Sequence, residues 1–240
     1  MPVIKKSTIG SIGSAVVSLA PAIAPGPAAA ALRKLADLAI DGVAFLPGAR
    51  SAAGKVLESK TGDVEAAIVS LVRSHTALAG AQGFATNLGG VITTIIAVPA
   101  NLAGVAILQT RLVASIAHLR GYDLEDLRVR EAIWMTLLGR RGVEELVGAG
   151  KLPSSPLGVA TAPVSDALLE QQIAEQVLGS LLARTSGKQT VAIVGKRIPV
   201  IGGGVGLAMD GWTTYSVAEY ARHQFVARRP NHLLPERPTD

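Results

Sequence analysis

The sequence contains no cysteine, which excludes disulfide bonds, cysteine-ligated zinc, iron–sulfur clusters and thiol catalysis. Aromatic residues are also scarce, with three Phe, two Trp and three Tyr among 240 residues. The four histidines, His75, His118, His223 and His232, include no pair three or four residues apart, so a metal site would have to be assembled from scattered positions. We therefore expect no metal and no cofactor.

Charge is sparse as well, because only 17% of residues are Asp, Glu, Lys or Arg, whereas 49% are hydrophobic. A mean hydropathy of +0.39 makes the chain too apolar to be intrinsically disordered. The net charge of +5 and pI near 9.7 are diffuse rather than concentrated in a basic stripe with interleaved aromatics. We therefore expect no nucleic-acid binding. Basic residues beside apolar stretches suit an anionic membrane surface, with a generic basic surface as the alternative.

Small residues are abundant, because 38 Ala and 26 Gly together make up 64 of the 240 positions. The longest stretch without a charged residue, 37 residues, extends from Ser74 to Thr110. As one helix it would extend about 55 Å, but Gly80, Gly83, Gly89-Gly90 and Pro99 interrupt it. We expect one apolar helix to end near Ala97 and another to begin at Pro99 and end at Arg120, with Gly121 as its left-handed cap. These two helices would form a central hydrophobic hairpin.

The remaining periodicity predicts an all-α fold, a Gly/Ala-rich helical bundle. Strand alternation is seen only over 190–194. We expect a linker or short helix over 49–60, a loop over 151–163, and helices over 28–45, from Asp63 onward, 124–138 capped by Asp123, 142–148, 165–184 and 203–227. The predicted organisation is a flexible segment 1–27, one helical domain 28–227 and a disordered tail 228–240.

The N-terminus has two interpretations. Lys5-Lys6 followed by an uncharged stretch that contains apolar residues resembles a secretory signal, and the protein would be secreted if residues 1–30 were removed as one. Glycines and serines dilute this stretch, and Pro21, Pro25 and Pro27 break any long helix. We therefore favour a flexible or surface-lying segment.

Glycine runs do not predict nucleotide binding. Gly202, Gly203, Gly204 and Gly206 fail the dinucleotide pattern because position 207 is Leu, and no GK[ST] follows them. Their small-xxx-small spacing instead favours close helix approach, either in a protein core or beside lipid. No serine elbow or carboxylate pair with catalytic spacing is present, so we assign no catalytic residues.

Several polar residues interrupt apolar segments and are expected to be buried with partners, as in an interhelical hydrogen bond. These buried polar candidates are Asn101, Gln109, Tyr122, Asp123 and Asp210. An enzyme site around Gln109, Tyr122, Asp123 and Asp210 is a minor hypothesis, because no nucleophile or metal constellation supports it.

Two motifs in order resemble the EcsC family of bacterial proteins, over about Gly80 to Phe225. The first starts at Val98-Pro99-Ala100-Asn101-Leu102, continues through Gln109 to Ile116-Ala117, and ends at Gly121-Tyr122-Asp123. The second is Ile198-Pro199-Val200-Ile201-Gly202 with Asp210 and Thr213-Thr214. Family members often carry an Asp beside the first Pro, where this chain has Ala97 and Asn101, so no role is assigned to that acid here.

The resemblance implies a cytoplasmic bacterial protein that touches the membrane and is accessory to transport or secretion, with no established activity. Our first hypothesis is a non-enzymatic protein that binds lipid, a membrane surface or a membrane protein, with a homo-oligomer as a further possibility. The residues assigned to lipid contact or helix packing are Gly83, Phe84, Gly89, Gly90, Ile92, Ile95, Pro99, Gly202, Gly203, Gly204 and Gly206.

Two alternatives stay open beside peripheral membrane binding. In one, residues 79–117 insert into the membrane as a helical hairpin. In the other, the protein is a soluble scaffold or interaction domain whose apolar helices form its core.

Overall fold

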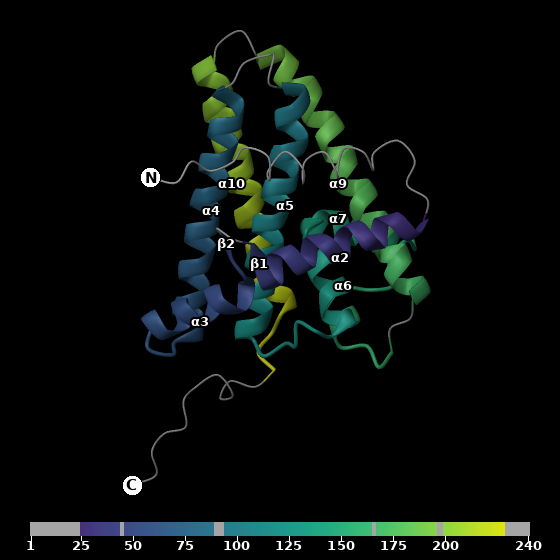
Figure 1. Cartoon of the computed structure of the whole chain (residues 1–240). Helices are drawn as coiled ribbons and strands as arrows, with labels where there is room; N and C mark the ends of the chain where they lie inside the picture. Colours follow the sequence, from purple (N-terminus) through teal and green to yellow (C-terminus); the bar gives the residue numbers. More distant parts are fainter. Residues whose placement is uncertain (1–24, 44–45, 89–93, 165–166, 196–198, 229–240) are drawn as a thin grey trace.

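The computed structural model describes residues 25–43, 46–88, 94–164, 167–195 and 199–228, without the side chains of 25–29, 31, 43, 46, 83–88, 94–103, 182–195 and 199–206. These residues confirm the all-α fold (Figure 1). The helices are α2 (Pro25–Asp41), α3 (Ala49–Ser59), α4 (Val64–Leu88), α5 (Thr94–Leu119), α6 (Leu127–Thr136), α7 (Gly139–Gly148), α8 (Pro156–Ala160), α9 (Ala167–Gly195) and α10 (Pro199–Gln224). A two-residue antiparallel ladder pairs β1 (Gly42–Val43) with β2 (Leu46–Pro47).

Two pairs of long helices dominate the architecture. The α4–α5 pair and the α9–α10 pair each reverse direction at the same end of the molecule, the upper end in Figure 1. Helix α5 contacts α2, α3, α4, α6 and α10, so it is the central helix of the described structure. Helix α2 lies across α5 and α9.

The most extensive helix–helix contact joins α4 to α10, and small residues make it possible. A Cβ atom at Gly80 would lie 3.2 Å from the backbone oxygen of Leu207, and one at Gly211 would lie 3.6 Å from the backbone oxygen of Thr76. A side chain at Gly80 would therefore crowd the α10 backbone, whereas a methyl group at Gly211 would make an ordinary contact with α4. Close approach gives dense dispersion contacts between the helices without large side chains.

The hydrophobic core surrounds the C-terminal half of α5. Leu112, Ile116 and the adjacent α6 residues Ile133 and Trp134 are fully buried. Two polar contacts fix α5 against its neighbours: Gln109 Nε2 donates to Thr214 Oγ1 of α10 at 3.1 Å, and Ser115 Oγ donates to the Ala49 carbonyl of α3 at 3.2 Å.

Ion pairs attach α2 to the rest of the bundle. Arg33 Nε donates to Glu170 Oε1 of α9 at 2.6 Å, and Glu170 is almost completely buried. Arg130 of α6 bonds to Asp37 of α2 at 3.0 Å and to Glu125 at 2.9 Å. Glu125 also pairs with Arg50 of α3. These contacts join α2, α3 and α6, which are far apart in the sequence.

Several predicted element boundaries are confirmed. Asp63 Oδ1 accepts the Ala66 N–H at 2.9 Å, so α4 begins with the expected cap. Gly121 adopts a φ of 85° after α5, as predicted for a left-handed cap. The segment 49–60 forms the short helix α3 rather than a linker.

Other boundaries are wrong. The break between the two apolar helices lies before Thr94, and Pro99 is within α5 instead of starting it. Asp123 does not cap the next helix, because Asp126 accepts the Arg128 N–H at 3.0 Å and α6 begins at Leu127. The expected loop 151–163 contains α8, which Ser155 caps. Residues 190–194 belong to α9 and are helical, not extended.

The described part of the chain includes no helix that is both long enough and apolar enough to cross a bilayer. Residues 1–24 and 229–240 lie outside the described residues, so the predictions of a flexible start and a disordered tail stay predictions.

We predict that Gly80→Val destabilises the protein by about 1–3 kcal/mol, because the new side chain meets the backbone of α10 and overpacks the contact. Gly54→Ala on α3 is the control, since no atom lies within 4 Å of the added Cβ. This change should stabilise the protein by about 0.5–1 kcal/mol through helix propensity and a less flexible unfolded chain. Denaturant unfolding of the two variants measures the difference, and equal stabilities would contradict the close packing of α4 and α10.

Candidate functional site

Most residues predicted to contact lipid or pack helices fall where side chains are not described. Gly83 and Phe84 are in α4, Ile95, Pro99 and Asn101 in α5, and Gly202, Gly203, Gly204 and Gly206 in α10. Gly89, Gly90 and Ile92 lie between α4 and α5, outside the described residues. The assignments of these residues stay predictions.

Of the buried polar candidates whose side chains are described, Gln109, Tyr122 and Asp210 are buried as predicted, whereas Asp123 is exposed, so the predicted burial of Asp123 is wrong. Gln109 is 6% exposed and joins α5 to α10 through its bond to Thr214. Asp210 is also buried and lies one turn before Thr214 on α10. An interhelical hydrogen bond is therefore confirmed for Gln109.

Tyr122 fastens the end of α10 to the end of α5. Its ring meets the Phe225 ring edge-on with centroids 5.1 Å apart, and the Arg228 guanidinium lies over the ring at 5.1 Å. The Arg228 N–H also donates to the Arg120 carbonyl at 3.0 Å. Burial raises the pKa of the Tyr122 hydroxyl, although Arg228 and Arg120 act in the opposite direction. The hydroxyl has no hydrogen-bond partner among the described residues.

Asp123 closes the turn that follows Tyr122. Its Oδ1 accepts the Glu125 N–H at 3.0 Å, a local turn bond. The next acid, Asp126, caps α6 and is bound by the Arg128 guanidinium, which is the main reason that its pKa lies below the ordinary value. Both carboxylates are therefore used to build the α5–α6 connection.

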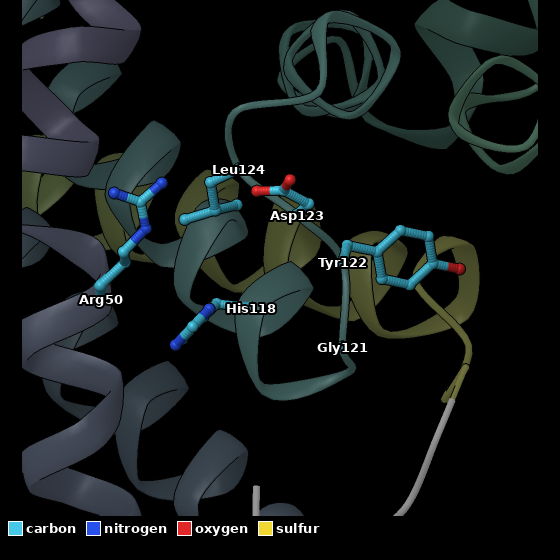
Figure 2. Close-up of a pocket in the computed structure, with 6 residues that line it drawn as sticks. All are labelled: Arg50, His118, Gly121, Tyr122, Asp123 and Leu124. Atoms are coloured by element: carbon cyan, nitrogen blue, oxygen red, sulfur yellow. The ribbon is translucent and has the colours of Figure 1, made fainter. Parts of the chain in front are cut away.

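A shallow hollow of about 250 Å³ opens at this turn. It is lined by Arg50, His118, Gly121, Tyr122, Asp123 and Leu124. Figure 2 shows that the Tyr122 ring points away from Arg50 and His118, so the polar groups do not converge on one point. Arg50 is already paired with Glu125. The hollow therefore has the features of a surface turn rather than of a reaction centre.

The structure does not gather the four residues of the enzyme hypothesis. Gln109 precedes the end of α5 by ten residues, or about 15 Å along the helix axis, whereas Tyr122 and Asp123 follow that end. Among the described residues, no three His, Asp or Glu side chains are grouped as metal ligands.

The most unusual surface is formed by exposed apolar residues of α10, which sequence reasoning missed. Helical spacing places Met209, Trp212 and Tyr215 on the outer face, whereas Leu207 lies at its edge, beside Gly80 of α4. Trp212 is 69% exposed, and Leu207, Met209 and Tyr215 are between 42% and 47% exposed. The Trp212 and Tyr215 rings lie 6.3 Å apart. We call Leu207, Met209, Trp212 and Tyr215 the apolar strip. Its signal in the sequence was two aromatic residues, three apart, in a chain with few aromatics.

Sequence reasoning also missed a pair of buried basic side chains. His75 of α4 is 4% exposed and Arg111 of α5 is 8% exposed. Burial, together with the positive charge of Arg111, lowers the pKa of His75 to about 4, although the hydrogen bond with the Leu71 carbonyl acts in the opposite direction. Arg111 is the first charged residue after the 37-residue uncharged stretch, and this isolation was the available signal.

We predict that Tyr122→Phe changes the free energy of unfolding by less than about 1 kcal/mol or raises it, because the buried hydroxyl has no described partner to lose. Tyr122→Ala should lower it by about 3–5 kcal/mol, since the contacts with Phe225 and Arg228 disappear. Urea unfolding distinguishes the two, and a large loss in Tyr122→Phe would show that the hydroxyl is bonded.

We predict an acid-sensitive contribution from His75, whose pKa falls from 6.5 to about 4 on folding. Between these values the unfolded chain binds a proton that the folded chain does not, so stability falls as pH falls below 6.5. The contribution should decrease by about 2 kcal/mol from pH 7.5 to pH 5. Unfolding of wild type and His75→Phe at both pH values isolates this component from the carboxylates, and equal pH dependence in the two proteins would contradict it.

Comparison with known proteins adds no relative: no family model, no curated protein and no solved structure matches this chain. The resemblance to the EcsC family therefore stays a prediction.

Proposed function

We propose that this protein is a non-enzymatic helical protein of EcsC type that binds the surface of an anionic membrane through the apolar strip of α10. The observation that carries the proposal is the exposure of Trp212 and Tyr215 beside Leu207 and Met209 on one helix. As the family resemblance implies, its role would be accessory to transport or secretion at the cytoplasmic face. Lipid, or a protein embedded in it, is the proposed partner.

The apolar strip has the composition of a membrane-interface element. Trp and Tyr combine an apolar ring with a polar atom and are enriched where a membrane meets water. Leu207 and Met209 add aliphatic surface that a protein in water would normally bury. Insertion of the strip among lipid headgroups would remove this surface from water while α10 stays packed on α4.

Acidic residues are also absent from the upper end of the molecule in Figure 1, which adjoins the apolar strip in the middle of α10. No Asp or Glu occurs over 66–122 or 176–209. These ranges include the upper halves of α4, α5 and α9 in Figure 1 and the part of α10 from Pro199 to Met209. The second range contains Arg184, Lys188, Lys196 and Arg197. Each basic residue near an anionic surface contributes about 1 kcal/mol, and no nearby carboxylate in these ranges opposes that attraction.

A second candidate function is partner binding by a soluble scaffold. It is favoured by the tight contact of Gly80 and Gly211 between α4 and α10, because there the small residues pack helix against helix. In that case the apolar strip would bind a protein rather than lipid. The following experiment distinguishes the two.

We predict that the purified protein floats with vesicles of phosphatidylcholine and phosphatidylglycerol, and more weakly with phosphatidylcholine alone. Trp212→Ser with Tyr215→Ser should weaken binding at least tenfold, since two large apolar side chains no longer insert. Leu168→Ser is the control. Leu168 is 71% exposed, but it lies in the first turn of α9 and not on α10. Equal losses in both proteins would contradict a specific role of the strip.

Charge and insertion can be measured separately in the same assay. Lys196→Gln with Arg197→Gln should weaken binding to anionic vesicles by more than tenfold, whereas Lys55→Gln with Lys60→Gln removes the same charge from α3 and its C-terminus and should have little effect. Trp134 is fully buried, so a blue shift of tryptophan emission on vesicles reports Trp212, and Trp212→Phe should abolish it. A folded protein that binds no vesicle contradicts the proposal and favours the scaffold.

A further inference from the structure

Arg111 is a buried cation without a counter-charge among the described residues. Its side chain is 8% exposed on α5, and its Nε atom has no hydrogen-bond partner there. Burial lowers the pKa of its guanidinium, and no described carboxylate offsets this effect. Arg33, Arg50, Arg120, Arg128, Arg130 and Arg222, by contrast, each pair with an acid. A largely buried cation without a counter-charge is unfavourable, so an anion bound beside Arg111 would stabilise it.

His75 lies on α4, near enough for the charge of Arg111 to lower its pKa, and supplies the second requirement. Its Nδ1 lies 2.9 Å from the Leu71 carbonyl oxygen, which can only accept, so Nδ1 carries the proton. Its Nε2 is then a hydrogen-bond acceptor, and it is buried without a partner among the described residues. The imidazole stays neutral at physiological pH because burial lowers its pKa to about 4.

The two side chains lie in one seam between α4 and α5, close to the surface. The side chain of Gln82 on α4 lies against Gly104 on α5. Gln82 is seven residues after His75, and Gly104 is seven residues before Arg111. These equal spacings of about two helical turns place His75 and Arg111 on the facing sides of antiparallel helices. Ser74, next to His75, is exposed, and Leu78, one turn along α4, is 49% exposed. The seam therefore borders exposed residues of α4.

A ligand for this pair must present anionic oxygens to Arg111 and one hydrogen-bond donor to His75 Nε2. Carboxylate and sulfate offer no donor at neutral pH. Inorganic phosphate keeps at least one P–OH group at that pH, and a phosphate monoester keeps one below its second pKa of about 6. We propose that Arg111 and His75 form a binding site for a protonated phosphate group. This inference is independent of membrane-surface binding by the apolar strip.

The first test compares two anions of similar size and shape on the unmodified full-length protein. Titration calorimetry with sodium phosphate and with sodium sulfate at pH 7 and equal ionic strength should show at least tenfold tighter binding of phosphate. The physical reason is that sulfate places an unprotonated oxygen against the acceptor His75 Nε2. Equal affinities, or no phosphate binding, would overturn the proposal, and neither result depends on a variant that must fold.

Variants then assign the two roles. Arg111→Gln should weaken phosphate binding at least tenfold, whereas Arg73→Gln, which removes an exposed arginine two residues before His75, should leave it unchanged. His75→Phe removes the acceptor and should abolish the preference for phosphate over sulfate while Arg111 still attracts both. Circular dichroism checks that each variant is folded. Phosphate binding that survives Arg111→Gln in a folded protein would contradict the site.

Two further arms identify the source of the phosphate group. Tighter binding of dihexanoyl phosphatidic acid than of glycerol phosphate at pH 6 would assign the site to a lipid head group. Equal binding of the two would assign it to a free phosphate.

The acidic residues outside the described part are Asp166, Glu236 and Asp240. If Asp166→Asn, Glu236→Gln and Asp240→Asn together raise phosphate affinity, a carboxylate of this chain occupies the site, and the proposal is overturned.

Discussion

The close contact of α4 with α10 is the constraint on which the rest of the structure depends. Gly80 and Gly211 bring the two backbones together, so α10 has one face fixed against α4 while Thr214 meets Gln109 of α5. Only the remaining face of α10 is left outward, and that face holds Trp212 and Tyr215. The glycines therefore determine that Trp212 and Tyr215 stay exposed, because α10, once packed closely on α4, cannot rotate to bury them.

Polar and aromatic contacts stabilise the end of the bundle where α5 and α10 finish. Tyr122 packs between Phe225 and Arg228 and closes the end of α5 on the end of α10. Arg130 joins α6 to α2 and to the α5–α6 connection. Asp123 and Asp126 form turn and cap bonds there. These contacts use charged side chains for structure at this end, whereas residues 66–122 and 176–209 contain no acid.

This separation of charge from apolar surface relates the two proposals without making one depend on the other. Membrane binding uses exposed side chains on α10, which need no change of fold. The phosphate site uses the interior seam between α4 and α5, where Arg111 and His75 are shielded from water. In such a seam an arginine distinguishes anions more sharply than on a surface, because water does not screen its charge.

The sequence by itself determined the fold class, the start of α4 at Asp63 and the end of α5 at Gly121, because helical periodicity, caps and left-handed glycines are local properties. It also predicted Gln109 as a buried polar residue. The predictions for the start of α5, the cap of α6 and residues 190–194 were wrong. At these positions the packing of α5, α6 and α9 against other helices overrides the local preference of the sequence. Only the tertiary structure decided that Trp212 faces outward and that His75 and Arg111 are buried on neighbouring helices. Exposure and pairing across helices depend on which faces the bundle brings together, and a single helix carries no record of its neighbours.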